Sequence, residues 1–132
     1  MSMKVAERST ILIVDDDAVL VNAVKEVLEG ARYRVLCAYD GERAVELAKA
    51  HRPDLIVMDV MMPTSGLTAL ESLRGLPETQ KIPILFLTGG PADGVFAAIE
   101  HDARIAYLKK PLDSNNLLEM TSLFLRLYPL AA

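Results

Sequence analysis

The 132-residue sequence contains one cysteine, Cys37, and no tryptophan. A single cysteine excludes an intramolecular disulfide, so we expect the reducing environment of the cytoplasm. No apolar run approaches the ~20 residues of a membrane-spanning helix. Residues 1–8 lack the apolar core of a signal peptide. Basic residues are also few: 14 Lys and Arg against 18 Asp and Glu give a net charge of −4. This balance argues against nucleic acid as a direct partner of the chain.

What the sequence does contain is typical of one folded globular domain. Hydrophobic residues make up 52% and charged residues 24% of the chain, a balance that excludes intrinsic disorder. We find no repeat, no low-complexity segment and no internal boundary in composition. We therefore expect a single domain over residues 1–132, with a folded core of about 10–128.

Short apolar runs alternate with segments of helical periodicity. The runs predict strands at residues 10–14, 33–38, 54–59, 84–88 and 105–108. The periodic segments predict helices at about residues 19–29, 41–50, 66–74, 95–100 and 114–128, and Asp17, Asp40 and Asp113 are suited to cap three of them. This alternation predicts an α/β fold: a doubly wound, five-stranded parallel sheet of order 2-1-3-4-5 with five helices, as in flavodoxin-like proteins.

Polar residues follow four of these strands, where each strand ends. Asp15 and Asp16 follow the first strand, and Asp59 ends the third. Thr88 ends the fourth strand, and Lys110 follows the fifth. Because the carboxyl ends of parallel strands share one edge of the sheet, we expect the acids at the switch point between strands one and three, with Thr88 and Lys110 beyond them on the same side.

Three carboxylates at one edge repel each other, since two of them ~4 Å apart cost roughly 4 kcal/mol at an effective dielectric of 20. One lysine neutralises only part of this charge. Hard oxygen ligands in small number suit Mg²⁺ or Mn²⁺, with waters and a phosphoryl group completing the coordination shell. A metal, a lysine and a hydroxyl around one carboxylate form a set that can transfer a phosphoryl group.

With this set of residues, the sequence resembles the receiver domain of two-component response regulators. The resemblance covers about residues 10–128 and rests on four segments in the usual order and spacing: Val14-Asp15-Asp16, Met58-Asp59-Val60-Met61-Met62-Pro63, Leu87-Thr88-Gly89 and Tyr107-Leu108-Lys109-Lys110-Pro111. Each segment alone has little specificity, but the ordered set is highly specific. The resemblance implies a signalling phosphoacceptor that catalyses only its own phosphorylation and dephosphorylation.

The resemblance also implies a role for each matching residue. Asp59 would accept a phosphoryl group from a histidine of a sensor kinase or phosphotransfer protein. Asp15, Asp16, Asp59 and the backbone carbonyl of Met61 would hold Mg²⁺. Lys110 and Thr88 would contact the phosphoryl oxygens, and Tyr107 would move with Thr88 as a switch. The Lys110–Pro111 peptide bond is expected to be cis, as is usual in the family.

The chain departs from the family pattern in several places. Only Thr64 and Ser65 separate Pro63 from Gly66, where the family commonly has three residues. We therefore expect either a tighter loop over Asp59 or a different start of the third helix. Ala18 replaces a frequent proline after the acidic residues. The sequence Gly89-Gly90-Pro91 makes the loop after Thr88 unusually permissive.

Two other functions compete with this interpretation. Asp15-Asp16-Asp17-Ala18-Val19 fits the D-x-D-x-[TV] motif of haloacid-dehalogenase-type phosphatases, in which Asp15 and not Asp59 would be the nucleophile. The second alternative is a degenerate receiver that binds a partner without being phosphorylated. The complete set of Asp59, acidic residues, Thr88 and Lys110 argues against it.

The last helix is more apolar than one buried stripe requires. Its apolar residues cover roughly 220° of the helix circumference at ~100° per residue, and they are Leu117, Leu118, Met120, Leu123, Phe124, Leu125, Leu127 and Tyr128. We expect this helix to contribute to a homodimer or to a docking face for an output partner. The residues after Pro111 are too few for an output domain, so the output is expected to act through protein contacts or through a longer protein.

Overall fold

A computed structural model describes residues 9–90 and 94–130 of the chain. The N-terminal segment 1–8, predicted to be no signal peptide, and Pro91 of the loop after Thr88 lie outside the described residues. No helix within the described ranges is long and apolar enough to cross a membrane.

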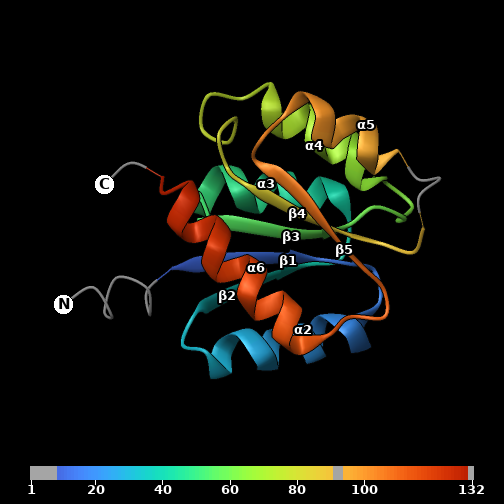
Figure 1. Cartoon of the computed structure of the whole chain (residues 1–132). Helices are drawn as coiled ribbons and strands as arrows, with labels where there is room; N and C mark the ends of the chain where they lie inside the picture. Colours follow the sequence, from blue (N-terminus) through green and yellow to red (C-terminus); the bar gives the residue numbers. More distant parts are fainter. Residues whose placement is uncertain (1–8, 91–93, 131–132) are drawn as a thin grey trace.

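Five strands form one parallel sheet in the order β2-β1-β3-β4-β5, as predicted. The order places β1 beside β3 at the centre (Figure 1). The register pairs Val14 of β1 with Met58 of β3, so the two strands end nearly level. The strands are β1 (Thr10–Val14), β2 (Arg34–Ala38), β3 (Leu55–Asp59), β4 (Ile84–Thr88) and β5 (Ile105–Lys109).

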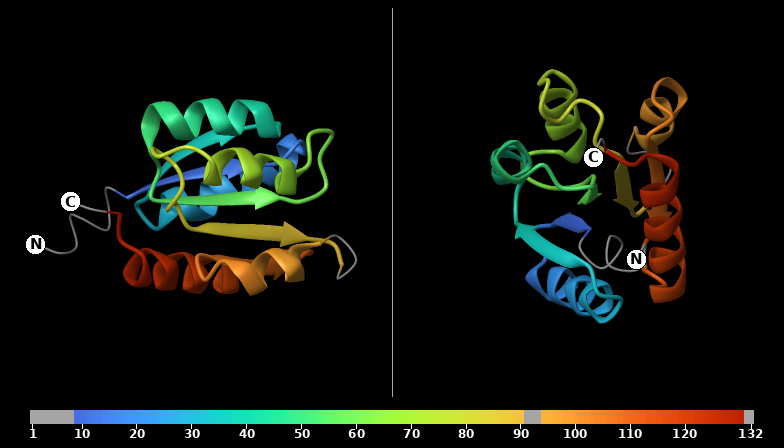
Figure 2. Two further views of the ribbon diagram at one scale, coloured as in Figure 1. Left: turned by 90° about the horizontal axis from the view of Figure 1, so that it is seen from above. Right: turned by 90° about the vertical axis from the view of Figure 1, so that its left-hand side faces the viewer.

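Helices cover both faces of the sheet, which is the doubly wound arrangement (Figures 1 and 2). The helices are α2 (Ala18–Gly30), α3 (Gly41–His51), α4 (Gly66–Arg74), α5 (Val95–His101) and α6 (Ser114–Leu127). Helices α3, α4 and α5 pack on one face and α2 and α6 on the other, because their buried residues belong to two separate apolar clusters.

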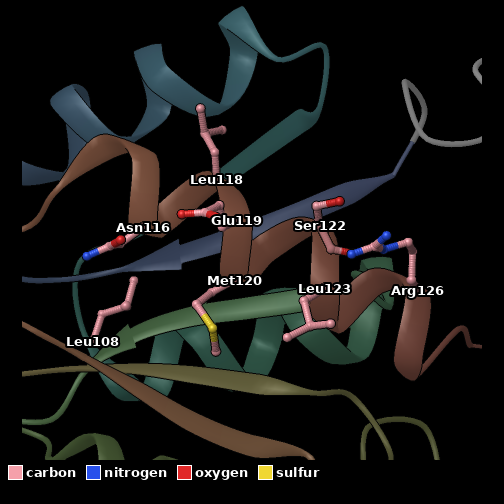
Figure 3. Close-up of a pocket in the computed structure, with 8 residues that line it drawn as sticks. All are labelled: Leu108, Asn116, Leu118, Glu119, Met120, Ser122, Leu123 and Arg126. Atoms are coloured by element: carbon pink, nitrogen blue, oxygen red, sulfur yellow. The ribbon is translucent and has the colours of Figure 1, made fainter.

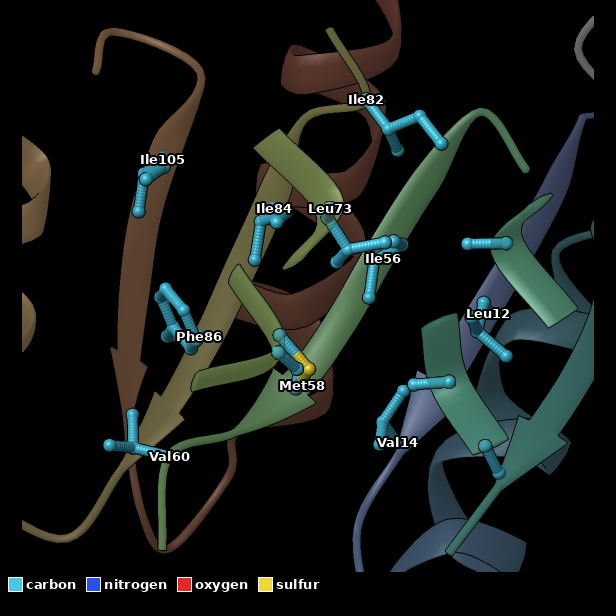
Figure 4. Close-up of a cluster of buried hydrophobic side chains, with 14 of the residues drawn as sticks. Leu12, Val14, Ile56, Met58, Val60, Leu73, Ile82, Ile84, Phe86 and Ile105 are labelled. Carbon is cyan, nitrogen blue, oxygen red and sulfur yellow. The ribbon is translucent and has the colours of Figure 1, made fainter. Parts of the chain in front are cut away.

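Alternation along each strand explains the two clusters. In β3, Ile56 and Met58 face α3 and α4 (Figure 4), whereas Leu55 and Val57 face α2 and α6. Strands β3 and β4 are buried along their whole length, which is why they appear in the sequence as uninterrupted apolar runs. Each fully buried Leu or Ile side chain contributes about 1.5–3 kcal/mol to folding.

The predicted caps form at the predicted helix starts. The Asp17 carboxylate accepts hydrogen bonds from the backbone N–H groups of Val19 and Leu20. Asp40 and Asp113 cap α3 and α6 in the same way. In α2, Val21 is fully buried and Leu20 is only half-buried.

Candidate functional site

The carboxyl ends of β1 and β3 bring three aspartates together. One carboxylate oxygen from each of Asp15, Asp16 and Asp59 lies within 4.8 Å of the other two. Asp15 and Asp59 are 1% and 3% exposed, whereas Asp16 is exposed to solvent. The cluster therefore has two buried acids behind one that faces the solvent, so an ion can reach it.

Lys110 bridges the two buried acids from the end of β5. Its Nζ lies 3.3 Å from Oδ2 of Asp15 and 3.3 Å from Oδ1 of Asp59. The backbone N–H of Lys110 donates to the carbonyl of Thr88 at 2.8 Å, and the Lys110–Pro111 bond is cis, as expected. One ammonium group faces three carboxylates, so the cluster keeps an excess of negative charge.

This excess of negative charge contributes to raised pKa values of both Asp59 and Lys110. Burial raises the pKa of Asp59 and the Asp15 carboxylate raises it further, while Lys110 and the Met61 N–H act against them. For Lys110, burial lowers the pKa, but Asp59 and Asp15 together outweigh burial and the pKa is raised. Lys110 therefore stays charged, and a further cation beside Asp59 would act against the burial and the Asp15 repulsion that raise its pKa.

Thr88 and Tyr107 extend the site along β4 and β5. Thr88 is 3% exposed, and its hydroxyl donates to the carbonyl of Gly90 at 2.7 Å and accepts from the Gly90 N–H at 3.1 Å. Tyr107 pairs in register with Phe86 and is half-buried against the apolar cluster shared by α3, α4 and α5. The hydroxyl of Thr88 is thus held by its own loop, next to the end of β3.

The loop after Asp59 is short and closes on itself. The N–H of Gly66 and the hydroxyl of Ser65 both donate to the carbonyl of Val60, at 3.0 and 3.3 Å. The N–H of Met61 donates to Oδ1 of Asp59 at 3.3 Å, and the Met61 side chain is 68% exposed. The loop therefore closes on the Val60 carbonyl, and it holds the Met61 backbone against the Asp59 carboxylate.

Two residues of this loop have structural roles that were not predicted from the sequence. Ser65 caps α4 by accepting from the Leu67 N–H at 3.1 Å, and a serine before a helical run is a signal that could have identified it. Gly66 packs directly on the Asp59 backbone, where a Cβ would overlap the Asp59 carbonyl oxygen. No pattern in the sequence predicts that the Gly66 backbone lies so close to the Asp59 backbone.

The donor set fits a hard divalent cation. The three clustered aspartates offer only oxygen, two of them are buried, and Lys110 leaves their charge partly uncompensated. Oxygen donors of this kind suit Mg²⁺, which keeps several waters and takes one or two carboxylates from the protein. Soft ligands are absent from the cluster, since cysteine and histidine do not contribute to it among the described residues.

Comparisons with known proteins agree with this geometry. The family of response regulator receiver domains matches residues 11–122. The transcriptional regulatory protein YvrH of Bacillus subtilis is 42% identical over 88 residues, which cover 66% of this chain and 36% of YvrH. The polar-differentiation response regulator DivK of Brucella anthropi is 29% identical over 88% of this chain and 95% of DivK. The chain thus spans about a third of one relative and nearly all of the other.

The solved structure of the chemotaxis protein CheY4 of Vibrio cholerae has the same fold. It superimposes with a TM-score of 0.81 at 28% sequence identity, over 89% of this chain and 98% of CheY4. The family match covers all four segments on which the resemblance rests. It therefore argues against membership of the haloacid-dehalogenase family. From its sequence, its sheet order and its strand-end cluster, the chain belongs to the response regulator receiver domains of two-component signalling systems.

Proposed function

We propose that this chain accepts a phosphoryl group on Asp59 from a phosphohistidine of a sensor kinase or phosphotransfer protein, in a reaction that requires Mg²⁺. The observation that carries the proposal is the buried Asp59 carboxylate, bridged by Lys110 and flanked by Asp15 and Asp16. We take residues 1–132 as one receiver unit with a core of about 10–128, acting in the cytoplasm.

The transfer is a direct displacement at phosphorus. An oxygen of Asp59 forms the new O–P bond while the N–P bond of the phosphohistidine breaks, and the electron pair of that bond returns to the imidazole nitrogen. The hydrogen bond from Met61 N–H and the ion pair with Lys110 both end on Oδ1 of Asp59. These two contacts fix the rotation of the carboxylate before the donor arrives, which lowers the cost of orientation.

Lys110 and the metal site share the task of balancing charge. Asp15, Asp16, Asp59 and the Met61 carbonyl would hold Mg²⁺, or Mn²⁺ in its place. The bound ion would supply positive charge for the phosphoryl oxygens. Lys110 already lies between Asp15 and Asp59 and can turn its ammonium group towards an incoming phosphoryl group without entering from solvent. The chain would catalyse only its own phosphorylation and dephosphorylation.

The same residues suggest how phosphorylation changes the surface. The Thr88 hydroxyl is held by Gly90, and we propose that it exchanges this partner for a phosphoryl oxygen. Tyr107 is half-buried on the neighbouring strand and would shift with Thr88. The face formed by α5, β5 and α6 would then carry the signal to an output partner.

Phosphorylation by acetyl phosphate, with and without Mg²⁺ and followed by intact mass, tests this function. Wild type should gain one phosphoryl group only with Mg²⁺, and Asp59→Asn should gain none. Asp15→Asn should need a much higher Mg²⁺ concentration to gain the phosphoryl group. An adduct that survives Asp59→Asn would contradict Asp59 as the acceptor. No adduct, together with no response to beryllofluoride, would favour a receiver that binds its partner without phosphorylation.

A further inference from the structure

The shape of the acidic cluster depends on how the loops around it pack against each other. Its proposed Mg²⁺ ligands come from two loops: Asp15 and Asp16 follow β1, and the Met61 carbonyl belongs to the loop 60–65 that follows Asp59. A separate groove of about 700 Å³ lies along α6 (Figure 3), and its lining includes Leu108, Met120 and Leu123. The contacts between the two loops and their neighbours therefore decide the space for the ion.

The short segment 38–41, which joins β2 to α3, touches both loops. The N–H of Asp15 donates to the carbonyl of Ala38 at 3.2 Å. Three residues further on, Gly41 lies against the loop that follows Asp59. A Cβ at position 41 would be 3.0 Å from Cγ2 of Thr64 and 3.1 Å from the Thr64 carbonyl oxygen. One segment of four residues thus fixes how far apart the two ligand-bearing loops lie.

This segment is itself firmly held. Oδ1 of Asp40 accepts the N–H of Arg43 at 2.8 Å, which fixes the start of α3 at Gly41. Gly41 and Ala44 are buried in the first turn. Ala69 of α4 also lies close, since its Cβ would be 3.3 Å from a Cβ at position 41. The start of α3 is therefore packed against α4 and has little room to move away from the loop.

The loop 60–65 is held on its other side by Gly66, which packs on the Asp59 backbone. A methyl group at position 41 requires its neighbours to move by a few tenths of an ångström. The contact of Gly66 with Asp59 blocks one direction of this movement, so the shift passes along the loop to Met61. The N–H of Met61 donates to Oδ1 of Asp59 at 3.3 Å, and the carbonyl of the same residue moves with it.

Such a shift affects cations of different size unequally. Mg²⁺ requires a near-ideal octahedron of oxygens at about 2.0–2.1 Å, whereas Ca²⁺ accepts six to eight oxygens at about 2.3–2.6 Å in variable geometry. A small displacement of one backbone ligand therefore costs more affinity for Mg²⁺ than for Ca²⁺, whichever way the ligand moves.

We infer that Gly41 and Thr64 are positioning residues that set the affinity of the acidic cluster for Mg²⁺ and its preference for Mg²⁺ over Ca²⁺. Neither residue belongs to the proposed ligand set, and both act through the Met61 backbone. The inference rests on the metal ligands of the proposed function, but it does not depend on phosphoryl transfer.

Thermal unfolding at increasing Mg²⁺ or Ca²⁺, without a phosphoryl donor, gives both dissociation constants. Gly41→Ala should raise the Kd for Mg²⁺ roughly tenfold, as is usual for a change behind a metal ligand, and the Kd for Ca²⁺ less than about threefold. Adding Thr64→Ser removes Cγ2, the atom nearest to the new methyl group. This double variant should bring the Kd for Mg²⁺ back to within about threefold of wild type.

Gly30→Ala is the matched control. Gly30 also lies at the end of a helix, and a Cβ there would meet nothing within 4 Å among the described residues. Neither Gly30 nor Gly41 has a positive φ, so alanine suits the backbone at both positions. Gly30→Ala should leave both dissociation constants unchanged, and circular dichroism shows that each variant is folded.

A purely structural role of Gly41 would lower the Tm without ions and leave the ratio of the two dissociation constants unchanged. That result overturns the inference, as does a Gly41→Ala defect that Thr64→Ser does not relieve. A wild type whose Tm does not respond to Mg²⁺ overturns both the inference and the metal site of the proposed function. Normal Mg²⁺ binding without phosphorylation of Asp59 would instead overturn the proposed function alone.

Discussion

Gly66 and Asp59 meet backbone to backbone, so closely that a methyl group at position 66 would overlap the carbonyl oxygen of Asp59. The same methyl group would lie 3.1 Å from the Cα of Val60. Glycine is therefore required here by space, in the loop that carries the proposed phosphoacceptor. Any larger residue must move either α4 or the end of β3.

Gly66→Ala should lower the free energy of unfolding by roughly 1–3 kcal/mol, the usual cost of overpacking, and should slow the gain of a phosphoryl group. Urea denaturation and intact mass measure the two effects. Gly75→Ala is the control, because its Cβ would make ordinary contacts at 3.5 and 3.6 Å with the carbonyls of Glu71 and Ser72. Equal stability of the two variants would show that the loop adapts to the extra methyl group.

Lys110→Ala tests the bridge between Asp15 and Asp59. Removing the ammonium group that lies 3.3 Å from both acids should slow phosphorylation by acetyl phosphate roughly 100-fold, the usual effect of deleting one charge-stabilising donor. Lys109→Ala is the control, since Lys109 is exposed on the neighbouring position, and its rate should stay within about twofold of wild type. Similar rates for the two variants would remove Lys110 from the mechanism.

Asp59→Asn should stabilise the metal-free protein at neutral pH. Burial and Asp15 raise the pKa of Asp59 in the folded chain, so folding favours the protonated carboxyl. Stability from this group is complete below the ordinary carboxyl pKa of about 3.9, and it is lost as the pH rises through the higher pKa of the folded state. Asparagine resembles the protonated form and avoids this loss.

The gain in Tm should be largest at neutral pH and should vanish towards pH 4. Thermal unfolding in the presence of a chelator measures it at each pH. Asp16→Asn is the comparison and should have a smaller effect, because Asp16 is exposed. A gain that grows towards acid pH would reverse the sign argued here.

The sheet and the acidic cluster could be predicted from the sequence for a physical reason. Strands buried on both faces appear as continuous apolar runs, and β3 and β4 are buried at every position. Once the strand order is known, Asp15, Asp59 and Lys110 must share one edge of the sheet. Their convergence depends on topology and needs no knowledge of side-chain distances.

Other features depend on distances that no local pattern encodes. The contact of Gly66 with Asp59 follows from how a short loop closes. Cys37 is half-buried in β2, whereas a lone cysteine is usually fully buried. Its exposure depends on how much of β2 the helices cover. The ion pair between Arg74 and Asp102 joins residues 28 positions apart, and no sequence pattern around either residue predicts the pair.

Asp102→Asn tests that ion pair at the edge of the sheet opposite the acidic cluster. The Nε of Arg74 lies 2.6 Å from Oδ2 of Asp102, both side chains are about one-fifth exposed, and Arg74 Nη1 donates to the Ile82 carbonyl at 2.8 Å. Loss of the carboxylate charge should lower the free energy of unfolding by roughly 1–3 kcal/mol, because Arg74 stays partly buried without its partner.

The control for this prediction is Glu46→Gln. The Arg43–Glu46 pair has a distance of 3.1 Å, but its side chains are 58% and 68% exposed, so the change should cost less than about 0.5 kcal/mol. Chemical denaturation of both variants gives the comparison. Equal losses would mean that burial does not strengthen the Arg74–Asp102 pair.

Met61→Asn tests whether the exposed side chain beside Asp59 sets the lifetime of the phosphorylated state. An acyl phosphate is hydrolysed by a water aligned with the O–P bond, and the Met61 side chain, 68% exposed, has no group that can orient it. Asparagine supplies a carbonyl and an amide at the same position. It should shorten the half-life of the adduct roughly tenfold, a barrier change of about 1.4 kcal/mol, while Met61→Leu should leave the half-life unchanged. Intact mass over time measures both decays, and equal half-lives would show that other groups position the water.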